Sequence, residues 1–176
     1  MLFYNVDFKY GIQNGQTLAW PLTIGSCYGT DYHSEAYRCG GRNNYIKWNL
    51  NLGQEDFEIR SEFQTRRVGV TGLSFVLWSG NDMLNIGLDG NGNKLFYSGG
   101  SWGKATLLGP TNLKAEIIQT IVIRRIGNVL KIALNGIEWN DLSLSESIDA
   151  VGWRPLRNTI YVKDLVQIIP TGRKKI

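Results

Sequence analysis

Hydrophobic and polar residues alternate in short runs along most of this chain, and turn-forming residues separate the runs. In the run 57–65 (FEIRSEFQT), large apolar residues occupy one parity and charged or amide residues the other. Because side chains of a strand point alternately to its two faces, this pattern predicts a half-buried strand with one solvated face. Ser61 is the exception, because it is a small polar residue on the apolar side.

Similar runs predict strands at 45–52, 73–80, 83–89, 94–100 and 158–169. The run 73–80 is almost continuously apolar, which is typical of a central strand covered on both faces. A hairpin is predicted over 119–136, because Gly127 and Asn128 separate two β-branched runs. Before that turn Ile121, Ile123 and Arg125 share one face, and after it Leu130, Ile132 and Leu134 share one. A short helix is expected only at 142–150, where Ser143 and Glu146 fit a capping box.

About ten strands, many turns and almost no helix predict an all-β antiparallel sandwich or barrel. Both the first and the last predicted strand are apolar, so we expect them to pair. The length of 176 residues suits a single domain, predicted over 1–170, with a basic tail at 171–176.

The net charge of +4 excludes few kinds of binding partner. Part of it comes from Arg173, Lys174 and Lys175, which we expect to be a solvated tail, or alternatively a contact to an anionic surface. The remaining arginines are scattered, and adjacent ones on a strand point to opposite faces, so we do not expect nucleic-acid binding. No apolar run approaches eighteen residues, so the sequence predicts no membrane-spanning helix.

The two cysteines, Cys27 and Cys39, are separated by eleven residues, with glycine near both. We expect a disulfide that closes a surface loop; the alternative is two buried free thiols. His33, between them, completes no familiar zinc spacing. A bridge of this loop size would contribute about 3 kcal/mol. It would also favour an oxidising compartment, so we expect an extracellular or secreted protein.

Three segments together resemble the concanavalin A-like lectin and glucanase superfamily, which includes laminin-G, pentraxin and galectin-type modules. They are the hairpin IIQTIVIRRIGNVLKIALNG, the closing strand NTIYVKDLVQI, and the strand FEIRSEFQ with the apolar strand and glycine-rich hairpin that follow it. The resemblance covers roughly residues 45–169. It implies a jelly-roll sandwich of two curved antiparallel sheets with a concave face, and often glycan or matrix binding.

This sequence lacks the catalytic and sugar-binding motifs of the known subfamilies. The one histidine, His33, is not part of a galectin-type His-x-Asn-x-Arg strand, and Trp102 does not begin a Trp-x-x-Glu-x-Arg element. Glucanases of this superfamily carry Glu-x-Asp-x-(x)-Glu. Here Glu58 and Glu62 are about 13 Å apart along an extended strand, too far for paired glycosidase carboxylates. Arg60 replaces the central aspartate and is expected to keep both carboxylates ionised.

The glycine-rich segment 87–103 (GLDGNGNKLFYSGGSWG) matches no phosphate-binding loop, and no helix is predicted after it. Asp89, Asn91 and Asn93 alternate as oxygen ligands of calcium would, although an EF-hand would need Glu where Gly100 stands. The alternative, which we favour, is a hairpin tip whose residues tolerate positive φ. No cofactor is therefore expected, with calcium left open.

Aromatic residues near predicted strand ends suggest a sugar platform. Trp78, Tyr97 and Trp102 would pack on sugar rings, and Asn81 and Asp82 would bond to hydroxyl groups. The alternative is that these aromatics cap the core.

Together these features predict a non-catalytic extracellular binding module, with glycan as the leading ligand. The alternative is a structural protein of an extracellular matrix or mineralised scaffold, contacting a protein partner or an anionic matrix surface. A polysaccharide hydrolase is the least favoured function.

Overall fold

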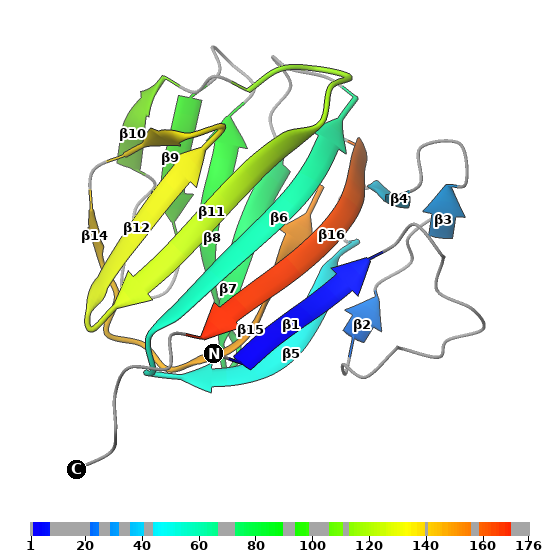
Figure 1. The fold of residues 1–176 in the computed structure, drawn as a ribbon. Helices are drawn as coiled ribbons and strands as arrows, with labels where there is room; N and C mark the ends of the chain where they lie inside the picture. Colours follow the sequence, from blue (N-terminus) through cyan, green and yellow to red (C-terminus); the bar gives the residue numbers. More distant parts are fainter. Residues whose placement is uncertain are drawn as a thin grey trace.

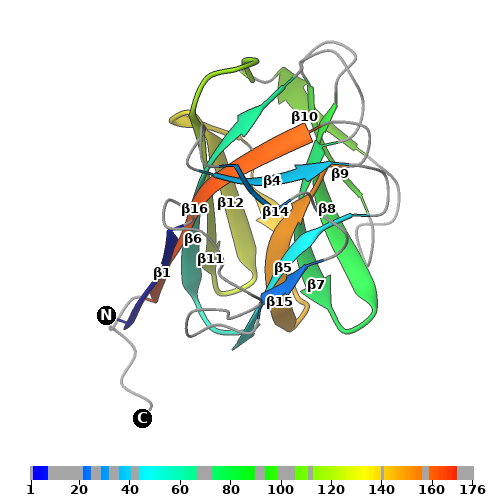
Figure 2. The same cartoon turned by 90° about the vertical axis from the view of Figure 1, so that its right-hand side faces the viewer.

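The computed structural model describes two antiparallel β-sheets packed face to face. The described residues are 2–7, 22–24, 29–31, 36–40, 44–66, 73–89, 94–98, 106–110, 113–139, 141–155 and 159–169. Side chains are described at 39–40, 44–66, 73–88, 113–139, 141–155 and 159–163. The predicted all-β sandwich is confirmed (Figure 1, Figure 2). Within the described residues, no helix has the length and apolar character needed to cross a bilayer.

Sheet A has nine strands in the described part of the chain. In spatial order they are β13 (Ile137–Glu138), β12 (Val129–Leu134), β11 (Gln119–Ile126), β6 (Phe57–Thr65), β16 (Thr159–Ile169), β4 (Ala36–Gly40) and β3 (Gly29–Asp31). In addition, β14 (Leu142–Ser143) pairs with β12, and β1 (Leu2–Asp7) pairs with β16. The predicted pairing of the first and last strands is therefore confirmed, and the two lie side by side in Figure 1.

Sheet B has seven strands in the described residues. In order they are β10 (Thr106–Pro110), β9 (Lys94–Ser98), β8 (Asp82–Asp89), β7 (Leu73–Ser79), β15 (Ile148–Arg154), β5 (Ile46–Gly53) and β2 (Leu22–Ile24). Strand β7 is central, and its residues from Leu73 to Trp78 are all buried, as its continuous apolar run predicts. Figure 2 shows β5, β7, β8 and β15 in one layer, facing β6, β11, β12 and β16 in the other.

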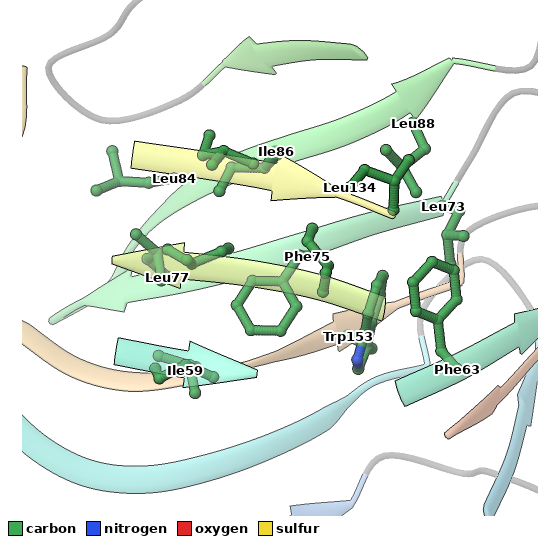
Figure 3. Packing of buried hydrophobic residues seen from close by; sticks show 14 of the residues in the cluster. Ile59, Phe63, Leu73, Phe75, Leu77, Leu84, Ile86, Leu88, Leu134 and Trp153 are labelled. Atoms are coloured by element: carbon green, nitrogen blue, oxygen red, sulfur yellow. The ribbon is translucent and has the colours of Figure 1, made fainter. Parts of the chain in front are cut away.

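The core between the sheets is organised around Trp153 of β15. Its ring lies 4.6 Å from the ring of Phe63 and meets Phe75 edge-on at 5.1 Å, measured between centroids (Figure 3). Its indole N–H donates a 3.0 Å hydrogen bond to Oγ of Ser61 on the opposite sheet. Ser61, the polar exception on the apolar side of its strand, therefore satisfies a buried donor that would otherwise cost free energy.

The predicted hairpin of β11 and β12 is confirmed, with Ile126 opposite Val129 and Gly127 at φ +57° in the turn. Ile123 lies opposite Ile132, and both are buried in the core. Arg125 shares that core-facing side and is 0% exposed. One core-facing position at the turn end of this hairpin is therefore occupied by a fully buried cation instead of an apolar residue.

The guanidinium of Arg125 holds three turns of the chain together. It donates hydrogen bonds to the carbonyls of Gly127, Gly53, Glu146 and Leu144, at 2.8, 3.3, 2.7 and 3.2 Å. Burial lowers the pKa of Arg125, and the nearby carboxylates of Asp56 and Glu146 oppose that shift. Four backbone carbonyls thus replace the water that a charged group would lose in the core.

The prediction of a helix over 142–150 is wrong. Residues 142–143 form β14, and β15 begins at Ile148. Leu142 and Leu144 are buried while Ser143 is exposed, so the segment follows the period of a strand. The carbonyl of Leu144 accepts from Arg125 instead of from a helical N–H four residues on. Tertiary hydrogen bonds and pairing with β12 have therefore outweighed the local capping signal.

Candidate functional site

The outer face of sheet B, which points away from the core, carries a group of side chains from four adjacent strands. They are Tyr45 (just before β5), Lys47 (β5), Arg154 (β15), Trp78 (β7) and Met83 (β8). We call these five residues the outer-face cluster. Their strand neighbours Ile46, Trp153, Leu77 and Leu84 point into the core, so alternation alone places the cluster outside.

Trp78 is the centre of the outer-face cluster. The ring of Tyr45 meets it at 6.3 Å between centroids and 60° between planes. Nζ of Lys47 lies 5.1 Å from the centroid of the Trp78 ring, within the range of a cation–π interaction. Arg154 and Met83 come from β15 and β8, the two strands that flank β7. Nη1 of Arg154 lies 3.5 Å from Sδ of Met83, and Met83 lies opposite Trp78. The cluster therefore combines aromatic, thioether and cationic groups in one place.

Small residues on β15 allow side chains of β5 to reach Trp78. The intervening positions Ala150 and Gly152 lie opposite Trp78 and Val76 of β7. Because neither carries a long side chain, Lys47 can extend across β15 to the indole. Gly152 also has no room for a larger residue, since a Cβ there would lie 1.8 Å from the carbonyl oxygen of Ile46.

Polar groups flank the aromatic centre. Oγ of Ser74 lies 3.4 Å from Oδ1 of Asn85, and Nδ2 of Asn85 donates to the carbonyl of Met83 at 3.2 Å. An amide has two donors and two acceptor lone pairs, so Asn85 retains capacity for a further hydrogen bond.

The structure brings three of the predicted ligand-binding residues to one hairpin. Trp78 is on β7, while Asn81 and Asp82 are both exposed where the chain turns into β8. The turn is held by the Gly80 N–H, which donates to Oδ2 of Asp149 at 2.6 Å. Trp78 itself is only 7% exposed, so it is not the open stacking surface that the sequence suggests. Its partner in the cluster, Tyr45, is half-buried and more accessible.

Several predicted residues fall wholly or partly outside the described part of the chain. Trp102, Asn91 and Asn93 lie outside it, and so do the side chains of Tyr97 and Asp89. The backbone register places Tyr97 opposite Ile86 and Asp89 opposite Lys94, which confirms the β8–β9 hairpin. The described residues contain no group of three potential metal ligands. The calcium site and the roles of Tyr97 and Trp102 stay predictions.

Only one of the two cysteines lies within the described residues. Cys39 is fully buried and disulfide-bonded, while Cys27 lies outside the described residues. The predicted Cys27–Cys39 bridge, and the compartment inferred from it, therefore stay predictions.

The acidic pair Glu58 and Glu62 lies on the other sheet, on the outer side of β6. Nε of Arg124, directly opposite on β11, donates to Oε2 of Glu58 at 2.7 Å. Arg60 is the cation that the sequence places between Glu58 and Glu62, and the structure adds Arg124 as a direct partner of Glu58. Residues directly opposite on paired strands are closer than residues two apart on one strand.

Sequence reasoning missed Tyr45, Lys47, Met83 and Arg154 as members of a site. Alternation shows that Tyr45 and Lys47 share one face of their strand. Nothing in the sequence shows that β15 pairs with that strand or that β7 follows β15 in the sheet, because β15 begins about a hundred residues further along the chain and β7 about thirty.

Known structures with this arrangement of strands were found by comparison of folds. A β-glucanase from Bacillus licheniformis has a TM-score of 0.69 at 10% identity, over 96% of this chain and 98% of that one. A carbohydrate-binding module, CBM66 from Bacillus subtilis, has a TM-score of 0.62 at 13% identity, over 84% and 94%. The chain has the concanavalin A-like fold. A Caenorhabditis elegans galectin shares this fold, with a TM-score of 0.58 at 11% identity, over 74% and 95%.

The concanavalin A-like fold is common to binding modules and enzymes among these structures, and at such identities the likeness concerns the fold alone. No family model and no curated protein matches the sequence. The side chains of this chain therefore carry the information about its function.

Proposed function

We propose that this protein is a non-catalytic glycan-binding module that holds a sugar against the outer face of sheet B. The observation that carries the proposal is the outer-face cluster, in which Tyr45 and Trp78 meet beside Asn85 and Ser74. Apolar C–H faces of sugar rings pack on aromatic rings, while amide and hydroxyl groups bond to sugar hydroxyls. In this arrangement Tyr45 makes the stacking contact and the more buried Trp78 supports it.

The distribution of carboxylates favours binding over hydrolysis. Most glycoside hydrolases use two carboxyl groups on either side of the scissile bond. Glu58 and Glu62 lie on the opposite sheet from the outer-face cluster, and Glu58 is paired with Arg124. The described carboxylates on the strands of sheet B, Asp82 and Asp149, lie at one end of the sheet beside the β7–β8 turn, where Asp149 accepts the hydrogen bond of the Gly80 N–H. A carbohydrate-binding module and a galectin among proteins of the same fold add support.

A glycan microarray with purified wild-type protein tests the proposal, once in calcium and once in EDTA. We expect binding to at least one glycan class and no release of reducing ends from the bound glycan. A blank array in calcium would contradict the proposed function, and released reducing ends would contradict its non-catalytic part. Loss of binding in EDTA alone would support the calcium site predicted at Asp89, Asn91 and Asn93.

Two tyrosine variants locate the site. Tyr45→Ala should weaken binding at least about tenfold, which corresponds to 1.4 kcal/mol. The matched control is Tyr161→Ala, because Tyr161 is also half-buried but lies on β16 of sheet A. Tyr161→Ala should bind as the wild type does, and both variants should unfold at similar temperatures. Equal affinity of Tyr45→Ala and the wild type would place the site elsewhere.

A further inference from the structure

Two cations of the outer-face cluster have no acidic partner among the described residues. Lys47 contacts the Trp78 ring, and Arg154 contacts Sδ of Met83. Both side chains are half-buried. Neither forms an ion pair with any carboxylate of the described part of the chain.

On the opposite sheet, two described cations have acidic partners. On the outer side of sheet A, Arg124 is paired with Glu58, and Nζ of Lys131 lies 3.0 Å from a carboxylate oxygen of Asp141. Acidic side chains thus neutralise these two cations, whereas no carboxylate of the described residues pairs with Lys47 or Arg154. An uncompensated positive charge beside an aromatic surface attracts an anionic ligand more strongly than a fully solvated charge does.

The two cations lie close enough to act on one ligand. Lys47 is directly opposite Gly152, two residues from Arg154 on the adjacent strand β15. Both positions have the parity of the outer face, so they are diagonal neighbours on it. Arginine binds planar anionic groups through a fork of N–H donors, and lysine acts as a compact charge. Together they suit the carboxylate or sulfate group of a sugar.

We infer that the ligand of this face is an acidic glycan, with its anionic groups bound by Lys47 and Arg154 and a sugar ring packed on Tyr45. This inference rests on the proposed function and adds the charge of the ligand to it. The shared chemistry is an anionic oxygen group, which a uronate carboxylate or a sulfate ester supplies.

Matched pairs of ligands test the charge requirement directly. Oligogalacturonate and its methyl ester differ in the carboxylate charge, and dextran sulfate and dextran differ in the sulfate groups. Each is titrated at 150 mM salt, alongside a microarray of neutral, uronate-containing and sulfated glycans, and we expect the array signal to be confined to acidic glycans. The galacturonate and sulfate arms tell which anionic group is preferred.

Charge-removing variants test the residues. Lys47→Gln and Arg154→Gln should each weaken binding of the acidic probe at least about tenfold, as expected for a lost charge-assisted hydrogen bond. Lys131→Gln is the control, because it removes the same unit of charge from sheet A and should change affinity less than about twofold. All three variants are compared with the wild type by thermal unfolding.

The outcomes separate this inference from the proposed function. Binding confined to neutral glycans, or equal binding of the acid and ester forms, would overturn the inference and leave a glycan-binding module. An equal loss in Lys131→Gln and Lys47→Gln would show attraction to overall charge and would also overturn it. Failure of the wild type to bind any glycan would instead remove the proposed function on which the inference rests.

Discussion

Replacing Arg125 with methionine should destabilise the protein by about 3 kcal/mol, because a buried guanidinium with four backbone partners is lost. Methionine keeps most of the apolar volume, so the loss reports hydrogen bonding rather than a cavity. The carbonyl of Leu144 is fully buried and would remain unsatisfied, at a cost of about 1–3 kcal/mol. The carbonyls of Gly53, Gly127 and Glu146 are only partly buried, so water replaces some of what they lose.

The assay is urea unfolding followed by tryptophan fluorescence, since Trp48 and Trp153 are fully buried and report on the core. The matched control is Arg124→Met on the same strand, whose side chain is 48% exposed and whose ion pair lies at the surface. That control should lose less than about 1 kcal/mol. At roughly 2–4 °C per kcal/mol for this chain length, Arg125→Met should unfold roughly 6–12 °C lower.

A second variant separates charge from geometry. Arg125→Lys keeps the positive charge but cannot direct donors to four carbonyls at once, so it should lose most of the same stability. The reasoning would be refuted if Arg125→Met and Arg124→Met had equal stability with unchanged m-values. It would be refuted in part if Arg125→Lys were as stable as the wild type.

Two further changes test the sandwich itself. Ser61→Ala should cost about 1–3 kcal/mol, because the buried indole N–H of Trp153 loses its acceptor. The exposed Ser147→Ala should cost less than about 0.5 kcal/mol in the same urea titration, and equal costs would exclude a role for the hydrogen bond. Gly152→Ala should prevent β5 and β15 from pairing, because the new methyl group would lie 1.8 Å from a backbone oxygen. Gly53→Ala meets no atom within 4 Å and should cost only about 1 kcal/mol for its positive φ, so a soluble Gly152→Ala protein of equal stability would contradict the close approach.

Strand positions were predictable because alternation is a local property. The strand predicted at 57–65 has those bounds, and the glycine turn of the 119–136 hairpin lies where expected. The helix at 142–150 failed because a local capping signal of modest strength competed with partners distant in the chain. Its actual partners, β12 and the guanidinium of Arg125, could not be identified from the segment itself.

The candidate site was only partly predictable. Trp78, Asn81 and Asp82 lie on one hairpin, as their closeness in the chain predicts, while their role in ligand binding stays a prediction. The sequence allowed Trp78 to be either exposed or core-capping, because the residues that contact it, Tyr45 and Lys47, come from a distant segment of the chain. Whether Tyr97 and Trp102 join the site stays a prediction.

The sequence by itself determined that this chain is an all-β protein, since the apolar period of two and the turn residues act within a few positions. It also marked Ser61 and Arg125 as polar residues on apolar faces, without giving the reason for either. Only the tertiary structure supplied the indole that Ser61 accepts from and the carbonyls that Arg125 binds. It also joined Tyr45, Lys47 and Arg154 around Trp78 and Met83, because strand order in a sheet is set by packing between segments far apart in the chain.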